Sequence, residues 1–586
     1  MNKNRLLPLS ALSLALLSSG LSAATYEIVP LATANKGLYS FANSIDGQGN
    51  VLLTVQNAFN PPIDVSLLDL DNNEALSNSL EAPDDVKNGV ISTRDRAILY
   101  TYILQNRGNP LFQQLGNYLG YLTDAEGSEA VVGFDAYDAD INGLSRSVDV
   151  LPAAINADGV AVGNSTAPFY KINYTNEADI EHTYLIRDFN RRGFVAINGL
   201  QVPLVPAETT FGGYSEARGV SDNLWVAGVS SIEKRESFDT AIENCNDDEK
   251  RGDFPIALCL SNSKPSVSSP NSQSGQPNED TADTYLGNYA TLDGAYKNRA
   301  TLWKIDNQGN VLDSKTFDLP FTPKEDDTVF YANRAADVNN NGIAVGVSHA
   351  SYPDYEDLIR TYAAVFYEDK TLPIGNEERY SDYTLRNNGL LSAATAINNH
   401  NQVIGYTLKL VNGFERTKFF VYDFDEQTMT YPDDFFPGSS SIARDINDAG
   451  QVVGDGEVES TIGGSVRRRN AFIYDNNDKQ FQNLNDLVSC NSPYTLVQAN
   501  AINESGEIAA TATYKRASLD IVGEPLLDSA GNQVMEEAIV AVKLVPIPGG
   551  DIDDCSGNQD KVERQGAGFG WWLLGLLGVS GLLRRR

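Results

Sequence analysis

A twelve-residue phrase, ARDINDAGQVVG at 443–454, returns along the chain with the same order of small, branched, amide or acidic, and glycine residues. Seven copies align on it. They are ANSIDGQGNVLL from Ala42, PAAINADGVAVG from Pro152, ARGVSDNLWVAG from Ala217, AADVNNNGIAVG from Ala335, ATAINNHNQVIG from Ala394, ARDINDAGQVVG from Ala443 and ANAINESGEIAA from Ala499. A chain in which one sequence pattern occurs seven times is built from repeated structural units. The repetition constrains the fold more than the composition does.

The phrase predicts two strands joined by a tight turn. The small residue and the Ile or Val three positions later point inward from the first strand. Asn or Asp then opens the turn, because its side chain can bond to the backbone two residues on. The Gly three positions later fits a left-handed backbone after a type I turn. The Val-x-Gly or Ile-x-Gly run returns as a second strand with period-two alternation.

A second pattern, a strand of aromatic and branched residues, follows each copy. The clear examples are RATLWKID at Arg299, AAVFYED at Ala363, KFFVYDFD at Lys418 and AFIYDNND at Ala471. The weaker examples are HTYLIRDF at His182, DVSLLDLD at Asp64 and EAIVAVKL at Glu537. Each unit therefore carries a turn-linked hairpin and at least one further strand.

The spacing of the copies favours a β-propeller. The last four copies begin 59, 49 and 56 residues apart, which is close to one four-stranded blade with modest loops. The earlier steps of 110, 65 and 118 residues require insertions, or a blade that has lost its signature. Because one hairpin cannot bury its own apolar face, the units must stack, and a closed ring leaves no terminal face uncovered. We expect an all-β propeller of seven blades, with six to eight allowed; a long β-solenoid is the competing arrangement.

The N-terminus has the layout of a secretory signal peptide. Lys3 and Arg5 precede an apolar run over 6–17, and the small residues of 22–24 follow. The run is too short to be interpreted first as a membrane span. We expect a signal peptide over 1–23 and a mature chain that begins near Ala24 or Thr25.

The C-terminus predicts a membrane anchor. Residues 566–583 carry no charge over 18 positions. As a helix they would span about 27 Å at ~1.5 Å per residue, near the ~30 Å core of a bilayer. Trp571 and Trp572 suit the interface, and the arginines of 584–586 would stay in the cytoplasm. We expect a repeat domain over 24–546, a linker over 547–565 and a transmembrane anchor or sorting signal over 566–586.

These residues carry two resemblances. The tail, with its glycine motif at 566–568, apolar helix and arginine cluster, resembles the GlyGly-CTERM sorting signal of Gram-negative bacteria, although the motif is not a clean Gly-Gly pair. That resemblance implies a rhombosortase-like protease and the type II secretion machinery as partners. The Ala471-Phe472 strand resembles the HAF-type extracellular repeats, and the whole chain resembles gammaproteobacterial secreted proteins whose central domain has no assigned function. The resemblance brings no catalytic residues.

Charge and cysteines also favour an exported protein. The formal net charge of −34 repels phosphate backbones, so nucleic acid is disfavoured as a partner. Four cysteines behind a signal peptide imply disulfides, with three possible pairings. We favour Cys245–Cys259, and Cys490–Cys555, which would tie the linker back to the preceding repeat. Zinc is disfavoured because the chain has no CxxC and only three histidines.

The sharpest chemical motif is DADINGLSRSVD at 138–149. Asp138, Asp140, Asn142, Leu144 and Asp149 stand at the ligand positions of a calcium loop, D-x-D-x-N-G-x5-[ED], with Asp in place of the usual Glu. Carboxylate oxygens at this spacing converge on one cation of calcium size. Against this, no flanking helix pair is evident, and an ordinary Asp/Asn turn explains the same residues. Calcium is the one cofactor that the sequence suggests.

Catalytic signatures are poorly represented. The chain has no H-E-x-x-H, no G-x-S-x-G and no P-loop. His182, His349 and His400 fall on a strand, just past a repeat and on a repeat turn. A carboxylate pair of the glycosidase type stays open, because 78 acidic residues offer many pairs. Aromatic strand residues could line a sugar site or pack between blades; they are Trp303, Phe366, Tyr367, Phe419, Phe420 and Tyr422.

We therefore expect an exported, surface-associated propeller that acts as a binding or interaction module, with a polysaccharide or a protein as its ligand. It would be anchored in the inner membrane facing the periplasm, and would reach the cell surface or the medium after tail processing. The alternatives are a secreted polysaccharide hydrolase with a carboxylate pair, and an envelope assembly or stress factor, so catalytic activity stays open. Residues 261–284, rich in Ser, Pro, Asn and Gln, predict a mobile loop that either binds or is a tolerated insertion.

Overall fold

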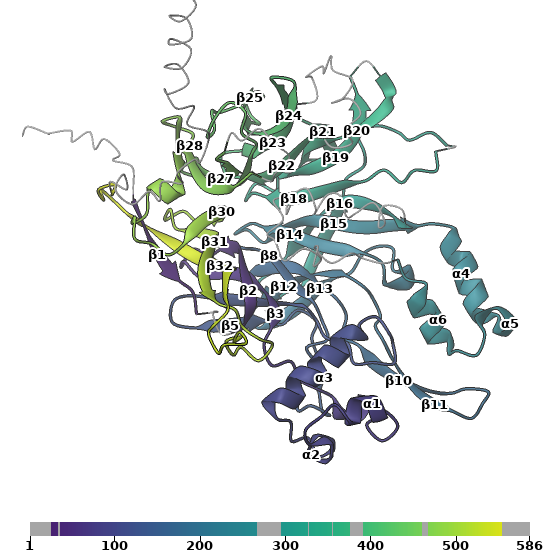
Figure 1. Cartoon of the computed structure of the whole chain (residues 1–586). Coiled ribbons are helices and arrows are strands. Elements are labelled where there is room, and N and C mark those ends of the chain that lie inside the picture. The colour runs from purple at the N-terminus through teal and green to yellow at the C-terminus, as the bar shows by residue number, and fades with distance from the viewer. Residues whose placement is uncertain are drawn as a thin grey trace, which may run out of the picture.

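The computed structural model describes residues 25–32, 36–265, 295–325, 327–353, 355–375, 391–459 and 467–553. Within these ranges, seven four-stranded antiparallel sheets follow one another along the chain and form a seven-bladed β-propeller (Figure 1). The predicted all-β propeller and its blade number are confirmed. The described helices lie in the connections between strands.

The blades are numbered in chain order by their innermost strand. Blade 1 contains β2 (Gly37–Ile45), β3 (Val51–Ala58), β4 (Tyr118–Thr123) and β5 (Ser128–Val131). Blade 2 contains β8 (Val150–Ile155), β9 (Ala161–Ser165), β12 (Arg192–Ile197) and β13 (Leu200–Leu204). Blade 3 contains β14 (Ser215–Val220), β15 (Trp225–Lys234), β16 (Tyr296–Ile305) and β17 (Val311–Thr316).

Blades 4 to 6 have the shortest connections. Blade 4 contains β18 (Asn333–Val338), β19 (Ala344–Tyr352), β20 (Tyr355–Tyr367) and β21 (Lys370–Pro373). Blade 5 contains β22 (Ser392–Ile397), β23 (Gln402–Val411), β24 (Phe414–Asp423) and β25 (Thr428–Thr430). Blade 6 contains β26 (Ser441–Ile446), β27 (Gln451–Glu457), β28 (Arg469–Asp475) and β29 (Gln480–Asn483), followed by the short helix η3 (Leu484–Asp486).

Blade 7 closes the ring by joining both ends of the domain. Its inner strands are β30 (Thr495–Ile502), β31 (Ile508–Ala517) and β32 (Met535–Ile547), and its outermost strand is β1 (Thr25–Pro30). β1 pairs antiparallel with β32 over six positions, from Thr25 opposite Ile547 to Pro30 opposite Val542. The first strand of the domain therefore completes its last blade.

All seven copies of the repeated phrase lie at the same place, the turn from the innermost to the second strand of a blade. In blade 2, Asn156 Oδ1 accepts hydrogen bonds from the backbone N–H groups of Asp158 and Val160. The fourth turn residue has a left-handed backbone in every blade: Gly49, Gly159, Leu224, Gly342, Asn401, Gly450 and Gly506 all have positive φ. The predicted turn is confirmed, including in the two blades where Gly is replaced.

The last glycine of the phrase has a separate cause. The innermost strand of every blade has a register shift directly after the small residue, for example between Ala443 and Asp445 in β26. In blade 6 the inner strand also lies close to the second strand beside this β-bulge. A Cβ at Gly454 would lie 2.1 Å from the carbonyl oxygen of Ile442. Only a glycine allows this approach without a shift of the backbone.

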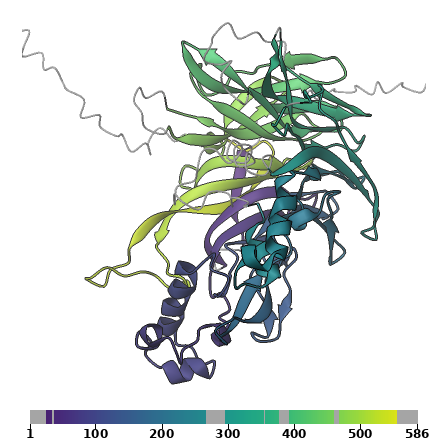
Figure 2. The same ribbon diagram turned by 90° about the vertical axis from the view of Figure 1, so that its right-hand side faces the viewer.

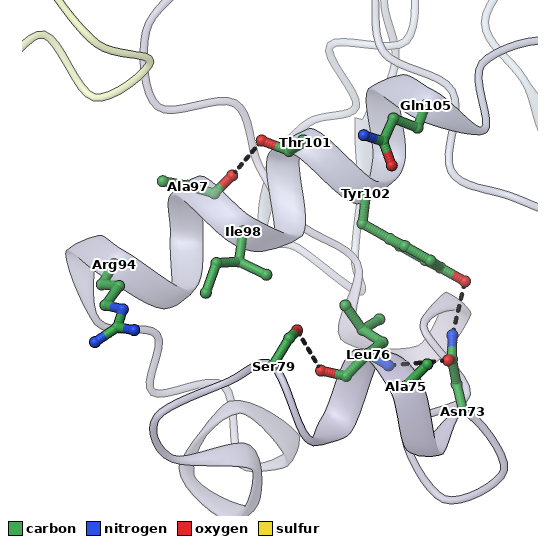
Figure 3. A pocket seen from close by; sticks show the side chains of 10 residues that line it. All are labelled: Asn73, Ala75, Leu76, Ser79, Arg94, Ala97, Ile98, Thr101, Tyr102 and Gln105. Atoms are coloured by element: carbon green, nitrogen blue, oxygen red, sulfur yellow. Dashed lines mark hydrogen bonds between the residues drawn. The ribbon is translucent and has the colours of Figure 1, made fainter.

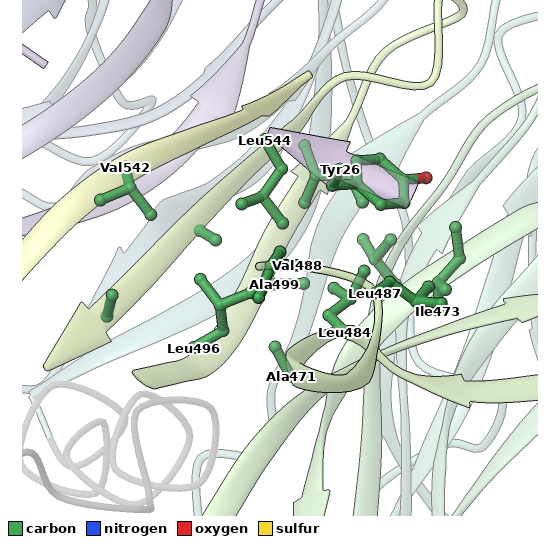
Figure 4. Packing of buried hydrophobic residues seen from close by; sticks show 14 of the residues in the cluster. Tyr26, Ala471, Ile473, Leu484, Leu487, Val488, Leu496, Ala499, Val542 and Leu544 are labelled. Carbon is green, nitrogen blue, oxygen red and sulfur yellow. The ribbon is translucent and has the colours of Figure 1, made fainter. Parts of the chain in front are cut away.

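The core is divided into seven apolar clusters, one between each pair of neighbouring blades. Figure 4 shows the cluster in which Leu484 and Ile473 of blade 6 pack against Leu496 and Leu544 of blade 7. The aromatic residues singled out in the sequence mostly belong to these clusters. Phe366, Phe419 and Phe420 are fully buried and Trp303 is 3% exposed. Their packing role is therefore supported.

Two of the aromatic strand signatures were assigned wrongly. DVSLLDLD at Asp64 forms the short helix η1 (Val65–Leu67), and the third strand of blade 1 is β4. HTYLIRDF at His182 forms β11 (Glu181–Ile186), which pairs with β10 (Tyr170–Thr175) outside the blades, and the third strand of blade 2 is β12. Branched and aromatic residues predict a strand but not the sheet to which it belongs.

The long spacings between early copies come from insertions and not from additional blades. The connection from β3 to β4 holds η1, α1 (Glu74–Ser77), α2 (Pro83–Lys87) and α3 (Thr93–Gln105). The hairpin of β6 (Tyr137–Asp138) and β7 (Gly143–Leu144) precedes blade 2. The connection from β15 to β16 holds α4 (Ser237–Asn246), α5 (Asp248–Arg251) and α6 (Ile256–Asn262), and η2 (Thr210–Gly212) precedes blade 3.

Several sequence predictions lie outside the described residues. These are the signal peptide over 1–23, the anchor over 566–586, and all of the 261–284 loop except its first five residues. In the part of the chain that the structure covers, no helix is long and apolar enough to cross a membrane.

Candidate functional site

The propeller has two faces with different connections. Because strands alternate in direction, the connections from strand 1 to 2 and from 3 to 4 lie on one face, here called the turn face. Those connections have two to five residues each. The connections from strand 2 to 3, and from one blade to the next, lie on the opposite face, here called the insertion face. Two of these connections, 59–117 and 235–295, are as long as a whole blade.

The turn face is bonded into a continuous ring. In five blades the Asn that opens the turn also donates its Nδ2–H to the backbone oxygen of the equivalent residue in the next blade. These bonds are Asn156 to Ser221 at 3.2 Å, Asn339 to Asn398, Asn398 to Asn447 and Asn447 to Asn503 at 3.1 Å, and Asn503 to Asp46 at 3.0 Å. We call this set of bonds the turn ring.

The two junctions that lack this Asn are closed by neighbouring amides. Asp46 and Ser221 cannot provide the amide N–H, so Gln48 Nε2 donates to the oxygen of Ala157 at 3.1 Å and Asn223 Nδ2 donates to the oxygen of Asn340 at 3.0 Å. The turn face thus uses its amides to hold the blades together. His400, one of the three histidines, lies in a turn of this face, as predicted.

Two carboxyl groups lie inside the ring on the innermost strands. Asp337 Oδ2 accepts a hydrogen bond from the N–H of Ile397 in the next blade at 3.0 Å, and Asp445 Oδ2 accepts one from Ile502 at 2.8 Å. Burial raises the pKa of Asp337 to about 6. Burial raises the pKa of Asp445 to about 7, and the charge of Asp337 adds to this shift. The only signal for this pair in the sequence is the shared position of the two residues in the repeated phrase.

Two other buried carboxylates are held ionised by arginines. Glu216 is fully buried and contacts Arg191 at 3.0 Å and Arg218 at 2.8 Å. Asp455 is also fully buried and contacts Arg444 and Arg469. Burial alone would raise the pKa of each carboxyl, but the paired guanidinium groups hold both values below the usual range. These groups stabilise the inside of the ring and are not available as a proton donor and acceptor.

The insertions on the other face form one connected structure. β11 joins the α1–α3 insertion through a hydrogen bond from Leu185 N to Pro110 O at 2.7 Å. Lys171 of β10 pairs with Asp64 at 2.8 Å and with Asp140 of the β6–β7 hairpin at 2.6 Å. We call these elements, together with α4–α6, the cap. Figures 1 and 2 show its helices beside blades 1 to 3, whereas the described connections of blades 4 to 6 carry no such helices.

The α4–α6 part of the cap is fixed at both sides. Tyr174 and the N–H of Glu177 both donate to the carboxylate of Asp253 at 2.9 Å. The predicted Cys245–Cys259 disulfide is confirmed, with 5.6 Å between the Cα atoms, and it joins α4 to α6. For the second predicted pair, Cys490 lies beside the linker, where its N–H donates to Asp553 at 3.3 Å, and Cys555 lies outside the described residues.

Large apolar side chains are exposed mainly on the insertion face. In the described chain they include residues of the cap and of the hairpin tips of blades 5 and 7. Examples, with exposed fractions, are Tyr137 65%, Ile180 53%, Phe254 49%, Phe414 64% and Leu527 61%. Those near the turn face, such as Leu200 and Val311, lie on outer strands and not in the repeat turns. Interaction sites are richer in exposed apolar side chains than the rest of a protein surface, so the insertion face is the candidate site.

The cap also contains a pocket of about 530 Å³ between α1 and α3 (Figure 3). Leu76 and Ile98 form its apolar floor, and Arg94 and Gln105 lie at its ends. Tyr102 Oη accepts a hydrogen bond from Asn73 Nδ2 at 2.7 Å, which fixes one wall. The pocket belongs to the insertion face and adds an apolar concavity to it.

The candidate calcium loop is divided between two places. Asp138 and Asp140 lie in the β6–β7 hairpin, with Leu144 exposed on β7, and Asn142 Oδ1 accepts from Tyr137 Oη at 2.6 Å. Asp149 instead accepts from the N–H groups of Asn117 and Tyr118. Among the described residues, no group of three or more Asp, Glu, His or Cys is arranged to hold a metal. Calcium binding by this loop would require Asp140 to leave Lys171.

These features define a β-propeller whose turn face is joined by hydrogen bonds between blades and whose insertion face carries the long connections. The chain belongs to a family described as proteins of unknown function (DUF3466), whose model matches residues 6–586. No curated protein matches the chain.

Proposed function

We propose that this protein is an exported, surface-associated propeller that binds a polysaccharide or a protein ligand through its insertion face. One observation carries the proposal: every large insertion and most exposed large apolar side chains lie on that face. The turn face uses its polar groups to hold the ring closed. A rigid scaffold with variable loops on one side is a common arrangement for binding.

The proposed membrane attachment agrees with this assignment. Thr25 and Ile547 pair at the turn-face end of blade 7, so the predicted signal peptide and anchor both join the domain there. The insertion face would therefore point away from the membrane, where a ligand can reach it. We propose that a rhombosortase-like protease and the type II secretion machinery act on the tail, as its sequence implies.

The test compares two matched sets of exposed residues. The cap variant carries Tyr137→Ser, Ile180→Ser and Phe254→Ser; the control carries Leu200→Ser, Val311→Ser and Leu312→Ser, which are exposed on outer strands near the turn face. Binding of each purified ectodomain to intact cells and to their extracted polysaccharides is measured. We expect the cap variant to lose at least roughly tenfold in affinity and the control to keep it. Loss of binding in the control but not in the cap variant would place the ligand near the turn face and would contradict the proposal.

A second function, polysaccharide hydrolysis, is favoured by one observation, the raised pKa values of Asp337 and Asp445. A carboxyl that stays protonated near neutral pH can act as a general acid. However, each carboxyl already accepts an inter-blade hydrogen bond, as Ser44 does at the equivalent position of blade 1. Loss of activity on a polysaccharide panel in Asp337→Asn and Asp445→Asn, but not in Ser44→Ala, would favour the hydrolase.

A further inference from the structure

The α1–α3 part of the cap has an apolar core of its own, and the pocket between α1 and α3 lies at the edge of that core. Leu80, Leu99 and Ile103 are buried in it. Leu76 belongs to the same core, and Ile98 packs against it, while both also form the floor of the pocket. The floor is therefore held in place by packed side chains.

Small side chains on the two helices leave the pocket open. Ala75 and Ser79 of α1 lie on one side of it, and Ala97 and Thr101 of α3 lie on the other (Figure 3). Larger side chains at these positions would fill the space between the helices. The volume of about 530 Å³ lies within the range of small-ligand sites, roughly 300–1,000 Å³.

One wall of the pocket offers a hydrogen-bond donor that is fixed in position. Asn73 Oδ1 accepts from Leu76 N at 3.1 Å, and Asn73 Nδ2 donates to Tyr102 Oη at 2.7 Å. The hydrogen atom of the Tyr102 hydroxyl is not used in that bond. The ring also packs against Phe112, with 5.7 Å between the ring centroids. Tyr102 can therefore donate to an acceptor that enters the pocket.

The remaining polar groups suit a neutral ligand. Gln105 lies about one turn beyond Tyr102 on α3, and its amide offers both a donor and an acceptor. Among the described residues that line the pocket, Arg94 is the one with a charge, and Glu81 pairs with it at 2.7 Å. The net charge of −34 also repels an anionic ligand. The pocket therefore complements a neutral group with a methyl, a carbonyl and an N–H.

We propose that this pocket binds the acetamido group of an N-acetylated sugar in a polysaccharide. The inference rests on the proposed binding through the insertion face, and it names the class of ligand. The acetamido methyl lies on Leu76 and Ile98. Its carbonyl accepts from the hydroxyl of Tyr102, and its N–H donates to Gln105 Oε1. A sugar with a hydroxyl in place of this group would put a polar group against the apolar floor.

The first test compares two trisaccharides with the same linkage. Tri-N-acetylchitotriose carries an acetamido group on each ring, and cellotriose carries a hydroxyl at the same position. Full-length protein is purified in a detergent without a sugar headgroup, and the binding of each trisaccharide is measured by isothermal titration calorimetry. We expect the N-acetylated trisaccharide to bind at least about tenfold more tightly. Equal affinities, or no binding of the N-acetylated trisaccharide, would overturn the inference.

The second test asks whether the sugar lies in the pocket. Ala97→Leu fills the space between the helices without removing a hydrogen bond, and we expect it to weaken binding at least about tenfold. Tyr102→Phe removes the donor but keeps the ring, and should weaken binding about 3- to 10-fold. The control is Tyr331→Phe, which removes a hydroxyl that donates to Asp327 at 2.7 Å before blade 4, and it should keep the affinity.

Thermal melting checks that each variant folds. If Tyr102→Phe does not fold, Ala97→Leu carries the test, because the two substitutions alter different atoms of the pocket. Wild-type affinity in Ala97→Leu and in Tyr102→Phe would place the sugar elsewhere and overturn the inference.

The outcomes separate this inference from the proposed function. If the cap variant loses binding to cells but tri-N-acetylchitotriose does not bind, the insertion face binds another class of ligand and only the inference fails. If Ala97→Leu weakens binding to protease-sensitive sites on cells and neither trisaccharide binds, the pocket takes an apolar side chain of a protein, which also overturns the inference. If the protein binds neither cells nor polysaccharides, both fail.

Discussion

The turn face and the insertion face are built from the same strands but are used in opposite ways. On the turn face the connections have two to five residues, and the Asn that opens a repeat turn bonds through its amide to the next blade. On the insertion face, the connections of blades 1 to 3 hold helices and hairpins that contact one another, as Lys171 does with Asp64 and Tyr174 does with Asp253. The turn face therefore holds neighbouring blades together, and the insertion face is the one that we propose for recognition.

The largest loss of stability should come from a substitution at Gly454, which lies opposite the β-bulge of blade 6. Gly454→Ala places a Cβ 2.1 Å from Ile442 O, so the inner strand has to move. We expect a loss of about 2–4 kcal/mol in the free energy of unfolding, measured by denaturant titration. The control is Gly413→Ala in the insertion-face tip between β23 and β24, where φ is +84° but no atom lies within 4 Å; it should cost only about 1 kcal/mol. Equal losses would show that the two faces are equally constrained.

The second-largest loss of stability should come from removing one of the hydrogen bonds of the turn ring. Asn447 is 2% exposed, and its amide bonds to Asn503 O and to Gln451. Asn447→Ala removes these bonds and leaves buried groups without partners, at about 2–3 kcal/mol. Asn176 is the matched control, because it caps the same kind of turn at the tip of β10–β11 without bonding to another blade. Asn176→Ala should leave the main unfolding transition in place, and a comparable loss there would contradict the role of the ring.

A smaller effect concerns the carboxyls inside the ring. The folded pKa of Asp445 lies at about 7, above its unfolded value. Its protonation therefore contributes stability that is present at low pH and is lost as the pH rises to about 7. Asp445→Asn does not titrate and can still accept the hydrogen bond from Ile502. We expect it to be roughly 1–3 kcal/mol more stable than the wild type at pH 8 and equal to it near pH 4.

The control for this experiment is Ser44→Asn, which changes the equivalent position of blade 1 without removing a titrating group. Its stability relative to the wild type should not depend on pH. The measurement is denaturant unfolding at four or more pH values. A pH-independent difference for Asp445→Asn would mean that the carboxyl is ionised throughout.

The smallest change in the stability of the propeller should come from removing the disulfide of the cap. Cys245–Cys259 closes a loop within the α4–α6 insertion, where it is worth about 3 kcal/mol in the chain-entropy model. Cys245→Ser/Cys259→Ser should therefore raise proteolysis of the cap while the propeller keeps its melting temperature. Limited proteolysis and calorimetry on the same sample separate the two. A lower propeller melting temperature would show that the cap and ring unfold together.

The sequence predicted the parts of the fold that depend on interactions within one repeat. The strand–turn–strand phrase, the left-handed turn position and the blade number all follow from residues such as Asn447 and Gly450, which act within a few positions of each other. The Cys245–Cys259 pair was also local in the sequence. The strand signatures at Asp64 and His182 failed because an isolated apolar strand has no mark of the sheet that it joins.

The candidate site depended on contacts that no local pattern carries. Lys171 meets Asp64 across 107 positions, and Asn503 meets Asp46 across 457. The calcium spacing at 138–149 looked complete in sequence, yet Asp149 is held by the backbone of 117 and 118. The pair Asp337 and Asp445 looked like ordinary repeat positions, and only their burial inside the ring gives them unusual pKa values.

The repeated phrase was enough to specify a ring of similar blades, because each hairpin exposes an apolar face that only another copy can cover. It did not determine which face of the ring would be free. That depends on the tertiary structure: alternating strands send every repeat turn to one face and every long connection to the other. Closure then brings Thr25 opposite Ile547, so that the first strand of the described domain begins, and its last strand ends, at the turn face.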